Sequence, residues 1–130
     1  FVLHEIHDTT ERSVLVAGVM DGHGGTAASA MVSSDFPNLL SNELIVNRSK
    51  LPEALENAWE TVSLLYRQTC FDPEECVADY NPAEGVLMAN TGSEDLIAGT
   101  TSSVMALDET TAKLTVMNCG DSRSLVATQD

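Results

Sequence analysis

The segment from Ser13 to Ala30, SVLVAGVMDGHGGTAASA, constrains the fold most, because it joins a strand pattern to a helix pattern through a glycine turn. The run Val14–Met20 is almost entirely aliphatic, which is typical of a strand buried on both faces. The glycines that begin at Gly22 predict that this strand ends at Met20. Asp21 then stands at the strand's end, where rigid backbone holds its carboxylate and neighbouring glycines let main-chain oxygens approach an ion. The segment therefore predicts a metal site.

Other apolar runs predict further strands around this one. Residues 1–8 alternate well enough for a strand, and the polar residues after them predict a hairpin into the strand of residues 14–20. Three later strand-like runs, at residues 100–107, 114–119 and 125–128, predict a β-meander. Together these patterns indicate an α+β domain with antiparallel strands.

Two helices are predicted between the early and the late strands. Residues 26–46 carry spaced apolar positions, although Pro37 predicts either a kink or the start of a second piece. Residues 52–66 form an amphipathic pattern whose apolar stripe consists of Leu55, Trp59, Val62, Leu65 and Tyr66. We expect Trp59 and Tyr66 to be core residues.

Residues 71–98 differ from the rest of the chain. They contain seven acidic residues and two prolines but no lysine or arginine, which predicts a long acidic loop. Two interpretations stay open. The loop is either a solvated insertion or a border of the active cleft that biases substrate choice by repelling acidic phosphopeptides.

The charge of the chain restricts its partners. Twenty acidic residues against six basic ones give a formal net charge of -14, so nucleic acid and anionic membranes are repelled at long range. A phosphorylated substrate meets the same repulsion, and a site for it needs bound cations.

Length and cysteine content suggest one compact intracellular unit. The 130 residues suffice for one modest core, and we expect a monomer. The three cysteines show no CxxC spacing, which favours a reducing compartment. No apolar run approaches the roughly 20 residues that span a bilayer, so the chain is predicted to be soluble. A start without methionine and an end after a strand-like run suggest a fragment of a longer protein.

Three motifs together resemble one known family. The DGHGG of residues 21–25 is similar to the motif of the metal-dependent serine/threonine phosphatases of the protein phosphatase 2C family. The run GTTSSVMA at residues 99–106 and NCGDSR at residues 118–123 resemble two later motifs of that family, in the same order. The resemblance implies that residues 1–130 are the amino-terminal part of such a catalytic domain. It also implies a partial four-layer α/β/β/α sandwich with antiparallel sheets.

The resemblance and the residues together suggest which metal ions the chain binds and which reaction they support. Asp21 and the Gly22 carbonyl are oxygen donors that suit Mg²⁺ or Mn²⁺, and two or more such ions are implied in the complete domain. The implied reaction is hydrolysis of phosphoserine and phosphothreonine in proteins by a metal-activated water. His23 is implied as the general acid for the leaving alkoxide. Asp121 occupies a family position that is associated with an additional, weaker metal site.

Part of the family's pattern is absent from the sequence. The family's upstream acidic pair and phosphate-binding arginine are missing, and Arg12, in the predicted hairpin turn, is a poor substitute. Asn118 and Arg123 are expected to be structural. In this family, the remaining metal-binding aspartates lie in the carboxyl-terminal half of the domain, after the three matched motifs. A catalytically inactive, phosphatase-like regulatory or binding domain is therefore the alternative to an enzyme.

Two other motif readings are weaker. GHGGTA satisfies a dinucleotide-binding fingerprint, but Asp21 would repel the pyrophosphate, and Glu43, the acidic residue at the required distance, falls in a helical stretch. GlyAspSer resembles an esterase nucleophile motif, yet the residues after Ser122 predict a strand where that motif needs a helix.

Overall fold

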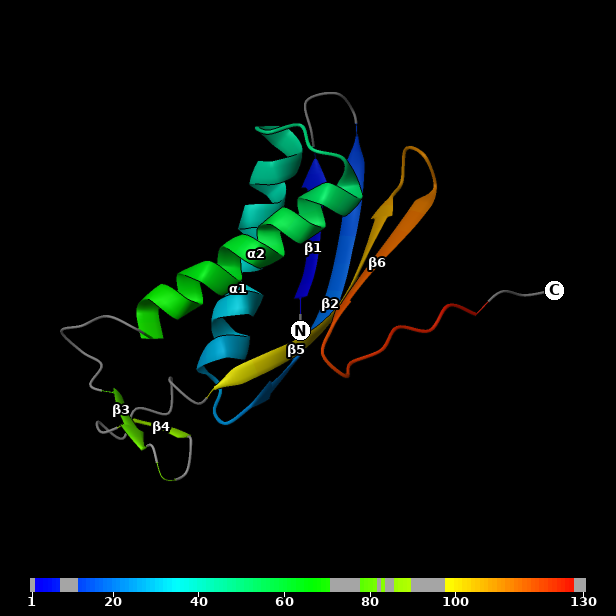
Figure 1. Cartoon of the computed structure of the whole chain (residues 1–130). Coiled ribbons are helices and arrows are strands. Elements are labelled where there is room, and N and C mark those ends of the chain that lie inside the picture. The colour runs from blue at the N-terminus through cyan, green and yellow to red at the C-terminus, as the bar shows by residue number, and fades with distance from the viewer. Residues whose placement is uncertain are drawn as a thin grey trace.

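A four-stranded antiparallel sheet carries two helices on one of its faces (Figure 1). The computed structural model describes residues 2–7, 12–70, 78–81, 83, 86–89 and 98–127. The sheet has the order β1-β2-β5-β6 and consists of β1 (Val2–His7), β2 (Ser13–His23), β5 (Gly99–Asp108) and β6 (Lys113–Cys119). The predicted α+β class is confirmed, and one sheet with helices on one face is consistent with a partial sandwich.

The register of β2 shows where the predicted strand end is wrong. The opening hairpin is confirmed, with Val2 opposite Gly18 and His7 opposite Ser13. β2 does not stop at Met20, however, but continues to His23, opposite Gly99 of β5. The ladder formed with β5 keeps the glycine-containing end of β2 extended, since neighbouring strands outweigh the weak strand propensity of glycine.

Both predicted helices are present, as α1 (Ala27–Ile45) and α2 (Leu51–Cys70). α1 runs through Pro37 as a single helix, so the alternative of a second piece starting there is wrong. Pro37 itself is buried, so its ring contributes to the packed side of α1. Within the part of the chain that the structure describes, neither helix is long and apolar enough to cross a membrane.

The core lies between the two helices and the sheet. α1 contributes residues at intervals of four, namely Val32, Phe36, Leu40 and Leu44, which form one buried stripe. Phe36 meets Trp59 of α2 edge to face, with ring centroids 6.4 Å apart. The predicted stripe of α2 is confirmed at Leu55, Trp59 and Val62, whereas Leu65 is 38% exposed.

The predicted acidic loop at residues 71–98 is only partly described. Two short strands within it, β3 (Ala78–Asn81) and β4 (Val86–Ala89), pair antiparallel as a separate two-stranded sheet. The structure therefore has strands at eight residues for which the sequence predicted a loop, and one of the two strands is the apolar run of residues 86–89. Apart from residue 83, the rest of the segment up to residue 97 lies outside the described residues.

The third strand of the predicted meander is absent over residues 125–127. β5 and β6 form the predicted hairpin, but Leu125 and Val126 are 96% and 68% exposed, and no strand pairs with them among the described residues. An apolar run without a neighbouring strand cannot complete a hydrogen-bond ladder, so it stays irregular.

The sheet's second face is open and partly apolar. Exposed apolar side chains on this face are Leu3, Leu15, Val19, Met105, Leu114 and Val116. In Figure 1, both helices lie on the other side of the sheet. The two faces alternate along each strand because successive side chains point to opposite sides.

Candidate functional site

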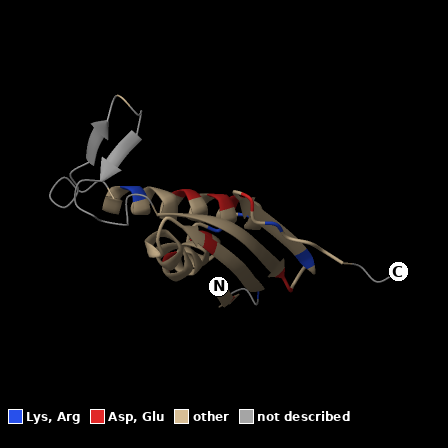
Figure 2. Ribbon diagram, turned by 90° about the horizontal axis from the view of Figure 1, so that it is seen from below, with Lys and Arg blue, Asp and Glu red and all other residues tan. Residues whose placement is uncertain are grey.

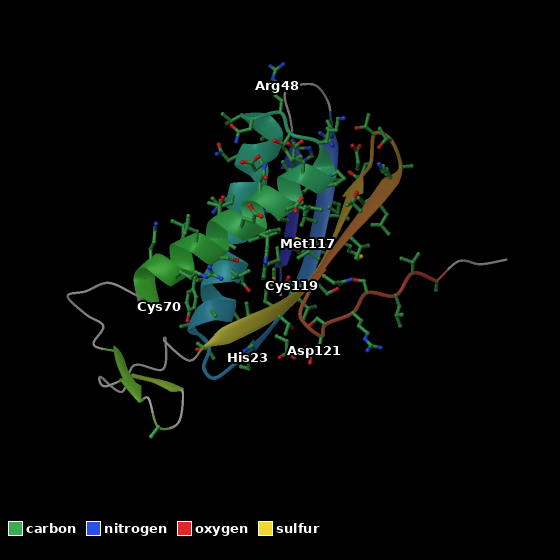
Figure 3. The ribbon with its side chains drawn as sticks, viewed as in Figure 1. His23, Arg48, Cys70, Met117, Cys119 and Asp121 are labelled. Carbon is green, nitrogen blue, oxygen red and sulfur yellow. The ribbon has the colours of Figure 1, made fainter. Side chains whose placement is uncertain are left out.

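Three of the four predicted site residues come from one end of β2, and the fourth comes from the turn after β6. Asp21, Gly22 and His23 line a depression of about 350 Å³ together with Asp121. Thr101 of β5 and Gly120 complete its described lining. Figure 3 shows His23 and Asp121 at the same end of the sheet. The structure thus brings all four predicted residues together, although Asp21 and Asp121 are separated by most of the chain.

The donor set of this depression fits a divalent cation of the magnesium type. Asp21 and Asp121 are both exposed, and within the described residues neither has an ion-pair partner and no Lys or Arg lines the depression. Two negative charges in one depression repel each other, and a bound cation relieves this repulsion. Mg²⁺ is commonly held by one or two carboxylates and several waters, so these oxygen donors suit it. The described residues contain no group of three or more His, Cys, Asp or Glu side chains placed to hold a metal.

His23 lies directly over a glycine of the neighbouring strand. It is paired with Gly99 in the register of β2 and β5. A Cβ atom built on Gly99 would lie 2.4 Å from His23 Nε2 and 2.7 Å from His23 Cε1, distances that no real Cβ contact allows. The missing Cβ of Gly99 is therefore what lets the imidazole rest against the end of β5.

The turn that carries Asp121 is fixed by contacts to β5. Gly120 has a φ of +82°, a left-handed conformation that costs a non-glycine residue energy. A Cβ there would also lie 2.8 Å from Thr101 Cγ2. Just after Asp121, the Ser122 hydroxyl is hydrogen-bonded to the Thr101 hydroxyl. The chain on both sides of Asp121 is thus held against Thr101.

The remaining motif residues have contacts of a structural kind. The Ser103 hydroxyl donates to Asn118 Oδ1 at 2.7 Å and is also hydrogen-bonded to the Ser124 hydroxyl. These bonds tie the segment after β6 to the open face of β5. The Thr100 hydroxyl donates to the backbone oxygen of Asp21 at 3.2 Å, which supports the end of β2.

Arg12 lies at the opposite end of the sheet from Asp21. Its Nε donates to Asp108 Oδ2 at 3.0 Å, and Asp108 is paired with Val14 at the start of β2. At about 3.3 Å per strand residue, Val14 and Asp21 are roughly 23 Å apart. Arg12 therefore does not line the depression, in agreement with its rejection as a substitute for the family's phosphate-binding arginine.

Sequence reasoning missed two residues of this site. Thr101 lines the depression, and Gly99 supports His23. A signal for both was present: with β2 extended to His23, antiparallel pairing puts the GlyThrThr run opposite the AspGlyHis run. With the strand predicted to end at Met20, this pairing could not be inferred.

Comparison with known proteins identifies the family. No curated protein and no solved structure matches the chain. A family model, described as Protein phosphatase 2C, matches residues 4–130, which is nearly the whole chain. The match includes β2, the turn after β6 and the depression between them. The chain belongs to the protein phosphatase 2C family.

Proposed function

We propose that this chain carries part of the catalytic centre of a metal-dependent phosphatase that hydrolyses phosphoserine and phosphothreonine in proteins. Family membership supports a phosphatase-type function in general. The observation that carries the finer proposal is the convergence of Asp21, His23 and Asp121 on one depression. Carboxylates can hold a catalytic metal ion and an imidazole can act as a general acid, so these side chains support two roles of this chemistry.

The carboxylates are proposed to hold Mg²⁺ or Mn²⁺. Asp21, on the ordered end of β2, and the main chain of Gly22 offer oxygens on one side of the depression, and Asp121 offers oxygens on the other. When bound, such ions activate water and neutralise phosphoryl oxygens. In a chain with a net charge of -14, this also gives an anionic substrate a locally favourable place to bind.

His23 is proposed as the proton donor. The leaving group is a serine or threonine alkoxide, which is strongly basic, so protonation of its oxygen by a ring nitrogen of His23 assists bond cleavage. The imidazole is exposed to solvent, which lets it recover a proton after each turnover. Its support on Gly99 limits where the ring lies relative to Asp21.

The activity is proposed for the longer protein that contains this chain. We expect the isolated 130 residues to be weakly active or inactive, because two carboxylates hold a divalent ion less tightly than a full set of protein ligands. The alternative is a phosphatase-like binding or regulatory domain without activity. It is favoured by the lack of a group of three metal-ligating side chains among the described residues.

A matched pair of variants tests the proposal. We expect Asp21→Asn to lower phosphatase activity of the longer protein with Mn²⁺ by about 10²- to 10³-fold, the range found when a central electrostatic contact is lost. Asp35→Asn makes the same change on α1, outside the depression, and should leave activity within about twofold. Titration calorimetry with Mn²⁺ should show weaker binding to Asp21→Asn only.

The outcomes separate the two functions. A parent protein that binds Mn²⁺ through Asp21 but hydrolyses no phosphoserine or phosphothreonine peptide would favour the binding domain. Equal activity of Asp21→Asn and the parent protein would exclude the proposed metal site altogether.

A further inference from the structure

A second depression lies at the other end of the sheet and is rich in basic residues. It has a volume of about 480 Å³ and lies between the start of α2 and the turn that joins β5 to β6. Four of the chain's six lysine and arginine residues line it, namely Arg12, Arg48, Lys50 and Lys113. In Figure 3, Arg48 lies at the end of the molecule opposite His23 and Asp121.

The acidic residues of this depression leave its basic charge in excess. Asp108 and Glu53 are the acidic residues in its described lining, against four basic ones. Asp108 already accepts hydrogen bonds from Arg12 Nε and from the backbone N–H groups of Thr110 and Thr111, at 3.0 to 3.1 Å. Figure 2 shows acidic positions on both helices, and the chain as a whole has a formal net charge of -14.

The basic side chains are attached to ordered backbone. The turn between α1 and α2 holds Arg48 with a φ of 54°, which is uncommon for a residue other than glycine. The next residue, Ser49, donates from its backbone N–H to the Glu43 backbone oxygen and from its hydroxyl to Glu43 Oε2, both at 3.0 Å. These bonds tie the turn to the last part of α1. They therefore fix the backbone from which the side chains of Arg48 and Lys50 extend.

One further feature of the wall favours an anion. The depression includes the first turn of α2, a helix of 20 residues, whose leading N–H groups carry partial positive charge. This partial charge adds to the charge of the four basic side chains.

We propose that this basic depression binds a phosphate-class oxyanion, at a place separate from the candidate metal centre. Lysine and arginine side chains form charge-assisted hydrogen bonds with phosphate oxygens, and the arginine fork can engage two of them. The volume lies in the usual range of about 300–1,000 Å³ for ligand sites. This proposal does not depend on the proposed phosphatase function. The phosphate group that this depression binds belongs either to a free phosphate compound or to a phosphorylated peptide.

Paired double variants test the site with inorganic phosphate as the probe. The isotope-labelled protein is titrated with phosphate by NMR at about 0.1 M salt, with a chelator that removes divalent ions. We expect saturable shifts at the amides of Leu51, Thr111 and Lys113, and none at Asp21 and His23. Lys50→Gln with Lys113→Gln should weaken binding by about tenfold or more.

The control makes the same change in net charge elsewhere. Arg67→Gln with Arg123→Gln removes the two basic residues outside the depression and should alter phosphate affinity by less than about twofold. Lys50→Arg with Lys113→Arg keeps the charge and should retain binding, which also shows that these positions tolerate substitution. Equal weakening by both glutamine pairs, shifts confined to the Asp21 end, or no saturable shift would overturn the proposal.

A second titration separates the two sources of the phosphate group. A phosphoserine peptide that binds at least about tenfold more tightly than inorganic phosphate, while its unphosphorylated form does not bind, would identify a phosphorylated peptide as the ligand. Equal affinity for the phosphopeptide and inorganic phosphate would identify a free phosphate compound. Both results support the site, since both require the basic depression.

Discussion

The depressions at the two ends of the sheet have linings of opposite charge, although the same strands run between them. At one end, Asp21 and Asp121 line a depression of about 350 Å³ without a described Lys or Arg. At the other end, four basic residues line a depression of about 480 Å³. Between the two ends, the covered face of the strands is almost entirely apolar. The comparison shows that this sheet supplies distance and rigidity, while the residues at the strand ends and turns set the charge of each end.

Among the contacts that distinguish the two ends of the sheet, the support of His23 by Gly99 gives the largest expected effect. Gly99→Ala should force the imidazole away, because its Cβ would lie 2.4 Å from His23 Nε2. If His23 is the proton donor, we expect kcat to fall by about 100-fold, equivalent to about 2.7 kcal/mol, with little loss of stability because the ring is exposed. Steady-state kinetics with a phosphopeptide would measure this.

A double-mutant cycle shows whether Gly99 acts through His23. In a His23→Ala background, Gly99→Ala should cost much less than in the parent protein, because the side chain that it displaces is gone. A full additional loss in that background would mean that Gly99 matters for another reason, such as the pairing of β2 with β5.

The opposite end of the sheet has its own sensitive contact, between Arg12 and Asp108. The side chain of Asp108 is 9% exposed and that of Arg12 is 28% exposed, so the pair is partly shielded from water. Arg12→Met should lower the free energy of unfolding by about 1–2 kcal/mol, since a mostly buried carboxylate loses a charged donor. Urea unfolding would measure it. Arg67→Met should cost less than about 0.5 kcal/mol, and equal costs would contradict the importance of the pair.

The turns at the two ends of β6 give a smaller pair of effects with opposite signs. Ala112, just before β6, has a φ of 52°, and Gly120, just after it, has a φ of +82°. Gly120→Ala should destabilise the protein by about 1 kcal/mol, because alanine is strained there and its Cβ meets Thr101. Ala112→Gly should stabilise it by about 0.5 kcal/mol, since the relieved strain exceeds the entropic cost of glycine. Thermal unfolding of both variants would show opposite shifts in Tm.

Much of this arrangement could be predicted from the sequence because it is local. The aliphatic run of β2 and the four-residue spacing of the apolar positions in α1 are periodic signals, and both elements are present. Asp21 and His23 are two residues apart on β2, so their side chains share one face of the strand. The proximity of Asp121 needed the family resemblance, since no local pattern connects the turn after β6 with β2.

The parts that the sequence did not predict depend on contacts between distant residues. β2 extends to His23 because β5 pairs with it, and the run at residues 125–127 is irregular because no strand pairs with it among the described residues. The basic depression combines Arg12 with Lys113, which are far apart in the chain and have no shared motif. Single-sequence patterns do not contain such long-range pairings.

Acid should affect the basic end of the sheet through Asp108, with the smallest effect of the four. Burial raises the pKa of Asp108, but hydrogen bonds from Thr111 and Arg12 outweigh it and hold the pKa below its usual value. In the pH range between the folded and unfolded pKa values, the unfolded chain binds more protons. The contribution of Asp108 to stability is therefore complete above about pH 4 and is lost as the pH falls through the lower, folded pKa.

Unfolding in urea between pH 6 and pH 3 would test this sign. The midpoint of the parent protein should fall as the pH drops below about 4, and the fall should be shallower for Asp108→Asn, which has no carboxylate to protonate. The pH dependence of the unfolding midpoint of Glu43→Gln is compared with that of Asp108→Asn. Glu43 lies at the same end of the molecule, and hydrogen bonds from Asn57, Ser49 and Asn47 lower its pKa. A parent midpoint that rose on acidification, or an Asp108→Asn curve as steep as the parent curve, would mean that these contacts do not lower the pKa of Asp108 in the folded protein.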